Sequence, residues 1–271
     1  MPQSQSEQPV ATWMDSIPAE QKIGIVIPMY GYFADLPEQQ LEWEALSVFL
    51  KSVKSRNLKS FLVFPAETKR LSKNVQNVLI GRQQGGGMEI VQMDPYSSYG
   101  DYVQEGISYL LEETDCQFIV IANPWIFLKE DSIDQMAQRL NTVNADLVCG
   151  VDLRKIVWDG KVGIPAEEFE VFNFNPPTEL NNKEFNLDFW GMTRAIAQVL
   201  KIDGTFKTKY FQLPDLWGNA FRASYSIVQT QYLPFYSFDV DWKQIDSEEE
   251  FLEDQAKFIA KWGFNPGTLW E

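Results

Sequence analysis

Ile23-Gly-Ile-Val-Ile-Pro28 is an uninterrupted apolar run that ends at a proline. Such a run predicts a strand buried on both faces, as in a parallel sheet, because a strand with one wet face alternates polar and apolar side chains. Residues 46–53 follow with apolar side chains at helical spacing. The ordered part of the chain is therefore expected to begin with a buried strand and a helix.

The same alternation continues to about residue 152. Further strands are expected at 61–64, 88–93, 118–122 and 147–151, and helices between them at 71–79, 99–111 and 133–143. Alternating strands and helices predict an α/β fold with a mainly parallel, Rossmann-like sheet covered on both faces. Ligands of such sheets bind beyond the carboxyl ends of the strands. Those ends are residues 28–30, 64–68, 94–98 and 123–125.

The composition excludes several classes of protein. The chain has 271 residues, a net charge of −15, two cysteines and no histidine. The negative charge argues against broad binding to nucleic acid, and the lack of histidine excludes a Ser-His triad or a His-based proton relay. We expect no integral membrane segment, since no run reaches the roughly 18–20 apolar residues of a span. A cytoplasmic protein without disulfides is expected, with Cys116 and Cys149 reduced in the core.

The organisation along the chain predicts one domain in two halves. Residues 1–20 are expected to be a loose tail, residues 21–152 the α/β half, and residues 153–271 a second half with a C-terminal helix. Within the second half, residues 189–200 and 248–262 are expected to be helical. Residues 224–233 alternate weakly as in a strand, and residues 210–222 are ambiguous.

Several segments carry a resemblance in their order and spacing. They are Ile25–Tyr30, Ser98–Ile107, Ile121–Asp131, Gly191–Arg194 and Phe206–Arg222, with Lys261–Gly263 as a further ending. Over roughly residues 22–225 the chain resembles the family-two glycosyltransferases of the GT-A fold, particularly the rhamnosyltransferase-like branch. The resemblance implies transfer of a sugar from a nucleotide-sugar donor to an acceptor that the sequence does not identify. It also implies that residues 21–152 bind the donor and residues 153–271 form the acceptor side.

The resemblance implies a set of site residues as well. Expected on the donor side are Pro28, Tyr30, Glu67, Lys69, Arg70, Tyr99, Gln104, Asn123 and Trp125, and expected on the acceptor side are Trp190, Arg194 and Trp217. Aromatic rings at strand ends can stack on a sugar or a base. For Tyr30 and Trp125, packing against neighbouring side chains is the alternative interpretation.

The metal motif of the family is degenerate in this chain. Asn123-Pro-Trp125 stands where the family has its Asp-x-Asp or Asn-Pro-Asp motif, and hard cations such as Mg²⁺ prefer carboxylate oxygens. Metal-independent or weakly metal-dependent transfer is therefore expected, with no cofactor required and a divalent cation not supported by the motif. Asp239 and Asp241 are weak metal candidates, better interpreted as a solvated turn. Lys69 or Arg70 is expected to replace the missing metal charge.

The catalytic carboxylate of the family aligns with Leu216, one residue after Asp215. Asp215 is therefore the expected general base of an inverting transfer. The alternative is that Asp215 only caps a helix. These replacements also support a rival hypothesis, in which the chain is a catalytically degenerate GT-A scaffold that acts as a binding or partner subunit.

Overall fold

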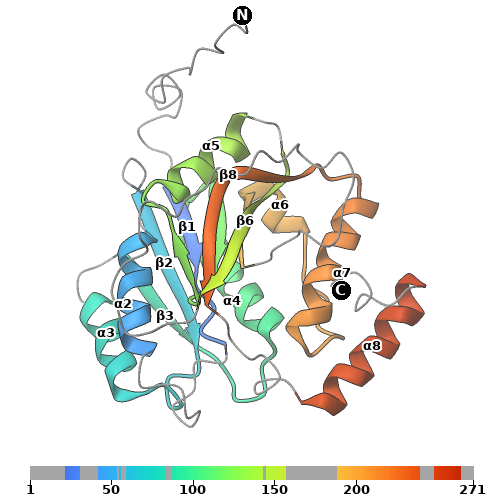
Figure 1. Cartoon of the computed structure of the whole chain (residues 1–271), viewed down its shortest axis with the longest axis horizontal. Helices are drawn as coiled ribbons and strands as arrows, with labels where there is room; N and C mark the ends of the chain where they lie inside the picture. Colours follow the sequence, from blue (N-terminus) through green and yellow to red (C-terminus); the bar gives the residue numbers. More distant parts are fainter. Residues whose placement is uncertain are drawn as a thin grey trace, which may run out of the picture.

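Eight strands of the described residues form a single sheet in the order β3-β2-β1-β4-β7-β6-β8-β5 (Figure 1). The structure is a computed structural model, and it describes residues 22–30, 42–53, 55, 59–83, 87–142, 145–156, 188–238 and 247–263. The strands are β1 Lys22–Val26, β2 Lys59–Ala66, β3 Met88–Gln92, β4 Phe118–Ala122, β5 Ile126–Leu128, β6 Leu147–Ile156, β7 Phe189–Thr193 and β8 Ile227–Phe238. The predicted tail at 1–20, Asp239 and Asp241 lie outside the described residues.

The helices of the described part are α2 Glu42–Ser52, α3 Lys73–Gln83, α4 Tyr99–Glu113, α5 Ser132–Thr142, α6 Arg194–Val199, α7 Lys209–Arg222 and α8 Glu248–Trp262. Strand β1 pairs in parallel with both β2 and β4, and β2 pairs in parallel with β3. The alternation expected for residues 23–122 is therefore confirmed. Strand 224–233 and helix 248–262 are also present, as β8 and α8.

The prediction of a helix over residues 189–200 is wrong for its first part. Residues 189–193 form β7, which lies antiparallel between β4 and β6, and the helix covers only residues 194–199. Tertiary pairing on both sides of β7 overrides the local pattern. Gly191 fits this central position because a Cβ there would lie 3.1 Å from Met136 Cγ and 3.2 Å from the Ile119 carbonyl oxygen.

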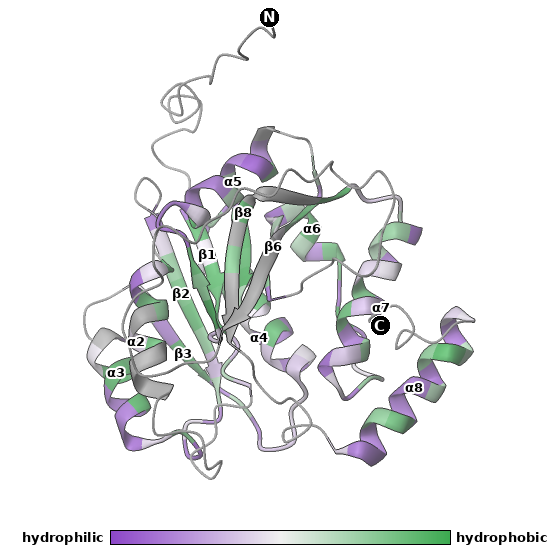
Figure 2. Cartoon of the chain, viewed as in Figure 1, coloured by the Kyte–Doolittle hydropathy of each residue, from purple (hydrophilic) through white to green (hydrophobic). Residues whose placement is uncertain are grey.

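The sheet is the middle of three layers, with helices on both of its faces (Figure 1). Helices α2, α3 and α5 pack with the residues of one apolar core, and α4, α6 and α7 pack with those of the other. The apolar colouring concentrates in the central strands, whereas the helices show polar outer faces (Figure 2). Both faces of the sheet are therefore buried under helices, so polar side chains of the sheet are expected at the ends of its strands.

Helix α4 is positioned at those strand ends. Its N-terminus carries a capping box, in which Ser98 Oγ accepts from the backbone of Asp101 and the Asp101 carboxylate accepts from the backbone of Ser98. Gly106 permits close packing on the sheet, because a Cβ there would lie 2.4 Å from Val26 Cγ1. The first turn of α4 therefore presents its side chains beside the ends of β1 and β2.

Candidate functional site

Polar and aromatic side chains gather where the parallel strands β1, β2 and β4 end. Because these strands run in the same direction, residues that follow them share one edge of the sheet. Tyr30, after β1, makes edge-to-face contacts with two tyrosines of α4, at 5.9 Å between ring centroids to Tyr99 and 5.5 Å to Tyr102. The structure therefore brings together Tyr30 and Tyr99, two residues predicted from the sequence to bind the donor.

Asn123, after β4, is tied to the start of β7 and of α7. Its side-chain Nδ2 donates to Asp188 Oδ1 at 3.0 Å, and its backbone N–H donates to the Asp188 carbonyl at 2.8 Å. Lys209 Nζ donates to the same Asp188 oxygen at 2.5 Å and lies 5.1 Å from the centroid of the Tyr99 ring. We call Tyr30, Tyr99, Asn123, Asp188 and Lys209 the strand-end cluster.

Asp188 and Lys209 were not predicted from the sequence. Neither belongs to a motif, and they are 21 residues apart in the chain. The antiparallel pairing of Ala122 with Phe189 places Asp188 opposite Asn123. One sequence signal could have indicated Asp188. It directly precedes the apolar run Phe189–Thr193, and assigning that run as a strand beside β4 would have placed Asp188 near Asn123.

Burial further favours the neutral form of the two tyrosines of α4, which a pKa of 10.0 already leaves protonated at physiological pH. Burial, and then the negative charge of Asp188, raise the pKa of Tyr99 well above its usual value. The pKa of Tyr102 is raised by burial and by the charge of Glu67, and this rise is only partly offset by Arg70 and the Glu67 backbone N–H. Both hydroxyls are therefore neutral at physiological pH and can donate hydrogen bonds.

Two buried atoms of the strand-end cluster lack hydrogen-bond partners among the described residues. They are Asn123 Oδ1 and the Tyr99 hydroxyl. Asn123 is 1% exposed and Tyr99 is fully buried. A buried polar atom without a partner costs about 1–3 kcal/mol, so such atoms favour the binding of a polar ligand group.

The end of β2 carries the predicted Glu67. Its side chain is buried, and Arg70 Nη1 lies 3.6 Å from Glu67 Oε2. Lys69 is exposed, and Pro28 is buried at the end of β1. Trp125 is half-buried and packs against the core on the α2, α3 and α5 side. This contact is the packing alternative considered for Trp125, and stacking on a ligand stays a prediction.

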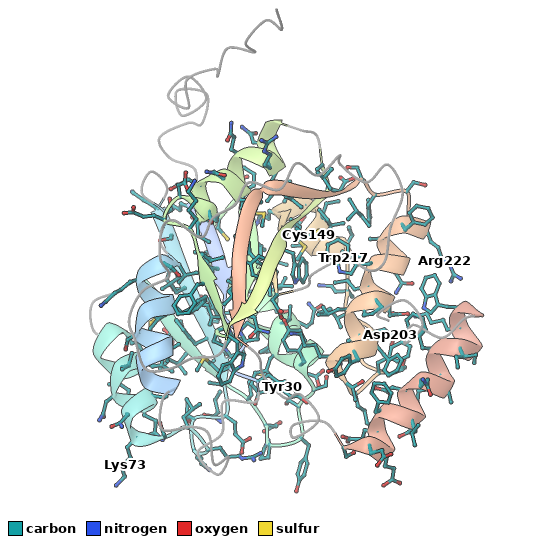
Figure 3. All side chains as sticks on the ribbon, viewed as in Figure 1. Tyr30, Lys73, Cys149, Asp203, Trp217 and Arg222 are labelled. Carbon is teal, nitrogen blue, oxygen red and sulfur yellow. The ribbon has the colours of Figure 1, made fainter. Side chains whose placement is uncertain are left out.

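Four other predicted residues make contacts away from the strand-end cluster. Gln104 Oε1 accepts from the Ile202 backbone at 3.4 Å, which ties α4 to the segment before α7. Trp190 is fully buried and meets Trp217 edge-to-face, with 5.7 Å between ring centroids. Figure 3 shows Trp217 on the side of α7 that faces the sheet. Trp190 and Trp217 are thus core residues, Gln104 is partly buried, and the ligand-binding roles of all three stay predictions.

Arg194, predicted on the acceptor side, closes the C-terminal end of α4. Its guanidinium donates to the carbonyls of Leu110 at 3.4 Å, Leu111 at 2.6 Å and Cys116 at 3.2 Å. Cations at this end of a helix satisfy carbonyls that have no partner within the helix. Arg194 therefore caps α4 in this structure, and its acceptor-side role stays a prediction. Cys116 and Cys149 are free and buried, as expected.

Asp215, the predicted general base, lies in a network of hydrogen bonds between α7 and α8, and its catalytic role stays a prediction. Its carboxylate is fully buried and accepts from Trp262 Nε1 at 2.7 Å and Asn219 Nδ2 at 2.9 Å. Lys261 Nζ lies 2.8 Å from Asp215 Oδ1. The oxygens are therefore occupied by donors of α7 and α8. Sequence patterns could not predict these contacts, because Lys261 and Trp262 are 46 and 47 residues away.

The residues at the end of β4 do not fit a divalent cation. Asn123 offers one neutral oxygen and Trp125 offers none. The carboxylate beside Asn123, that of Asp188, is paired with the Lys209 ammonium, which would repel a metal ion. Within the described ranges, no three His, Cys, Asp or Glu side chains gather closely enough to hold a metal. The described side chains at this edge are therefore an amide, a carboxylate and an ammonium group rather than a set of carboxylates.

The strand order, with parallel β1 to β4 and the antiparallel β7 inserted before β6, defines a GT-A-type α/β fold. No family model matches the sequence, and no curated protein matches it. Among solved structures, S. aureus TarS 1-349 matches with a TM-score of 0.58 at 10% identity, over 89% of this chain and 65% of that chain. At such identity the likeness shows the fold alone.

Two ligand complexes of the same TarS fragment also match. The complex with UDP-GlcNAc has a TM-score of 0.60 at 12% identity, over 89% of this chain and 66% of that one. The complex with UDP has a TM-score of 0.56 at 12% identity, over 92% of this chain and 68% of that one.

None of the described helices is both long and apolar enough to cross a membrane.

Proposed function

We propose that this chain is a glycosyltransferase that binds a nucleoside-diphosphate sugar at the carboxyl ends of β1, β2 and β4. The observation that carries the proposal is the strand-end cluster, which places a partly buried cation, a carboxylate and two buried polar atoms without partners at the ligand edge of a GT-A-type sheet. The TarS structures with UDP and UDP-GlcNAc make uridine nucleotides the first donors to test.

The roles in donor binding follow from position. Pro28 and Tyr30 end β1 and suit the nucleobase, and Glu67 at the end of β2 suits the ribose hydroxyls. Asn123, which follows β4 on the other side of β1 from Glu67, suits the diphosphate and the sugar together with Tyr99. Because the donor set does not fit a metal, the transfer is proposed to be metal-independent. The rhamnosyltransferase-like branch stays a prediction from the sequence.

Inverting transfer needs a carboxylate that takes the proton of the acceptor hydroxyl as that hydroxyl attacks the anomeric carbon. With Asp215 held by Lys261 and Trp262, we assign this role to Asp188. The Asp188 side chain is 20% exposed and lies beside Asn123. Unlike Asp215, Asp188 is thus a partly exposed carboxylate next to the proposed donor site, although its Oδ1 accepts from Asn123 and Lys209. The free, buried cysteines are in keeping with a reducing compartment.

The test is calorimetry with UDP, GDP and dTDP, followed by hydrolysis and transfer assays with the corresponding sugar nucleotides. Micromolar binding of one nucleotide, with release of the nucleoside diphosphate in the presence of a chelator, supports the proposal. Turnover that a chelator abolishes contradicts the metal-free mechanism. Lack of binding to any of the three contradicts the donor site.

The second candidate is a catalytically degenerate scaffold that binds a sugar nucleotide or a protein partner without turnover. The observation that favours it is the loss of both metal carboxylates together with the burial of Asp215. Nucleotide binding without any turnover, even with acceptor panels, would support this candidate. Turnover of a sugar nucleotide would exclude it.

A further inference from the structure

We propose that Lys209 supplies the positive charge that holds the donor diphosphate, in the place where a GT-A fold otherwise uses a metal ion. This inference rests on the proposed function and assigns a residue to it. It also replaces the sequence-based expectation that Lys69 or Arg70 carries this charge.

The ammonium group of Lys209 lies close to Asn123, the residue in the motif position. Lys209 Nζ is bonded to Asp188, which is bonded to Asn123, so the cation lies two hydrogen bonds from the residue in the motif position. A metal ion at the end of β4 would occupy the same neighbourhood. A single cation there serves the same purpose, because it offsets the charge of the phosphates and of the leaving nucleoside diphosphate.

Burial is the second argument. The Lys209 side chain is 12% exposed, whereas that of Arg70 is 38% exposed and Lys69 is fully on the surface. A charge shielded from water acts more strongly on a nearby phosphate, because the effective dielectric constant is lower and salt screens it less. Lys209 is therefore the stronger electrostatic site for a diphosphate.

The backbone that carries Lys209 is fixed from two sides. Just before it, the backbone N–H groups of Lys207 and Thr208 donate to the buried Asp254 carboxylate of α8 at 2.7 and 2.8 Å. One turn later, Gln212 Oε1 accepts from the Gly100 backbone at 2.7 Å, and Gln212 Nε2 donates to Ser98 Oγ at 2.6 Å. Lys209 is thereby preorganised next to α4 before any ligand arrives.

The buried atoms around Lys209 indicate a ligand of matching chemistry. The Tyr99 hydroxyl, without a partner among the described residues, is a donor that suits a phosphate oxygen. Asn123 Oδ1, in the same situation, is an acceptor that suits a ribose or sugar hydroxyl. An ammonium group carries three N–H donors and can bind Asp188 and a phosphate oxygen together. The Lys209 cation, the Tyr99 donor and the Asn123 acceptor together match the groups of a diphosphate linked to a sugar.

The experiment compares UDP with uridine in calorimetry, both in EDTA. Lys209→Gln is expected to weaken UDP binding roughly 10- to 100-fold, as for loss of one charge-assisted hydrogen bond, and to leave uridine binding unchanged. Lys209→Arg keeps the charge and is expected to restore most of the UDP affinity. Lys207→Gln is the matched control, since Lys207 is two residues away, 50% exposed and paired with Glu253. It is expected to bind UDP as the unmodified chain does.

Footprinting of the unmodified chain gives an answer that does not depend on a variant's folding. UDP is expected to protect Lys209, but not Lys207, from acetylation followed by mass spectrometry. Equal UDP affinity in Lys209→Gln and the unmodified chain, or no protection of Lys209, would overturn the inference and leave the proposed function in place. Loss of UDP binding in EDTA alone would also overturn it. Failure of the unmodified chain to bind any nucleoside diphosphate would instead refute the proposed function.

Discussion

Asp215 on α7 and Lys261 on α8 form an ion pair, with 2.8 Å between Lys261 Nζ and Asp215 Oδ1, in which the carboxylate is fully buried. Trp262 and Asn219 donate to the same carboxylate, and Arg222 lies over the Trp262 ring at 3.7 Å from its centroid. Figure 3 shows Arg222 and Asp203 in the space between the two helices. This network, with the aromatic cluster of Phe206, Phe211 and Phe258, joins the C-terminal helix to the rest of the fold.

Asp215→Asn is expected to lower the free energy of unfolding by about 1.5–3 kcal/mol, because charge-assisted hydrogen bonds are lost and Lys261 loses a buried partner. Urea unfolding followed by circular dichroism measures the change. Glu253→Gln is the matched control, since Glu253 is an exposed carboxylate of α8 that pairs with Lys207 and Lys257. Its unfolding is expected to change little. If Asp215→Asn kept full stability but lost turnover, Asp215 would be the base after all.

Gly218 of α7 allows Trp262 to pack against the helix. A Cβ at residue 218 would lie 2.6 Å from Trp262 Cη2, and an aromatic ring cannot flex away. Gly218→Ala is therefore expected to destabilise the chain by about 1–2 kcal/mol, a cost of overpacking that exceeds the gain in helix propensity.

Gly81 of α3 provides the matched comparison for Gly218. A Cβ at residue 81 would meet nothing within 4 Å. Gly81→Ala is thus expected to stabilise the chain by about 0.5–1 kcal/mol, because alanine has the higher helix propensity. Thermal unfolding of the two variants measures both effects. Equal shifts of Tm in the same direction would show that the contact of Gly218 with Trp262 is not tight.

Asp203 makes part of the stability depend on pH. Although burial raises the pKa of this carboxyl, hydrogen bonds from Lys261 and from Thr205 lower it overall from 3.8 to about 2. A pKa lowered in the folded state gives stability that is present above about pH 4 and is lost as the pH falls toward 2. Relative to Asp203→Asn, the unmodified chain should gain about 1–2 kcal/mol at pH 6, reduced for partial exposure. Urea unfolding from pH 2.5 to 6 tests this, and a difference that does not vary with pH would refute it.

The parts of the fold that could be predicted from the sequence are those with a strong local signal. Ile23–Val26 and Phe118–Ala122 are apolar throughout, and the stripe of α4 from Tyr99 to Leu110 keeps one helical face. A strand buried on both faces is apolar throughout, and a helix buried on one face has an apolar stripe. Both patterns can be recognised without knowing which distant residues pack against them. Parallel pairing then places Glu67, Tyr30 and Asn123, in this order, along one edge of the sheet.

The parts that could not be predicted depend on pairs far apart in the chain. Strand β7 is defined by its neighbours β4 and β6 rather than by its own pattern. The partner of Asn123 comes from residue 188, and the partner of Asp215 comes from the last helix. A carboxylate in sequence looks the same whether it faces a ligand or a lysine. The role of Asp215 was therefore open until the position of α8 was known.

The assignment of Asp188 as the base can be separated from donor binding by Asp188→Asn. The asparagine can still accept a hydrogen bond from Asn123 and from Lys209, so the donor site should keep its shape and bind UDP within about threefold of the unmodified chain. Transfer to an acceptor, or to water in a donor-hydrolysis assay, should fall by about 10²–10⁴-fold, as for loss of a general base. Glu67→Gln is the comparison at the end of β2, where the expected effect is weaker donor binding with a smaller change in kcat. Unchanged kcat in Asp188→Asn would remove this residue from the mechanism, whereas loss of both UDP binding and turnover would mark it as a structural partner of Lys209.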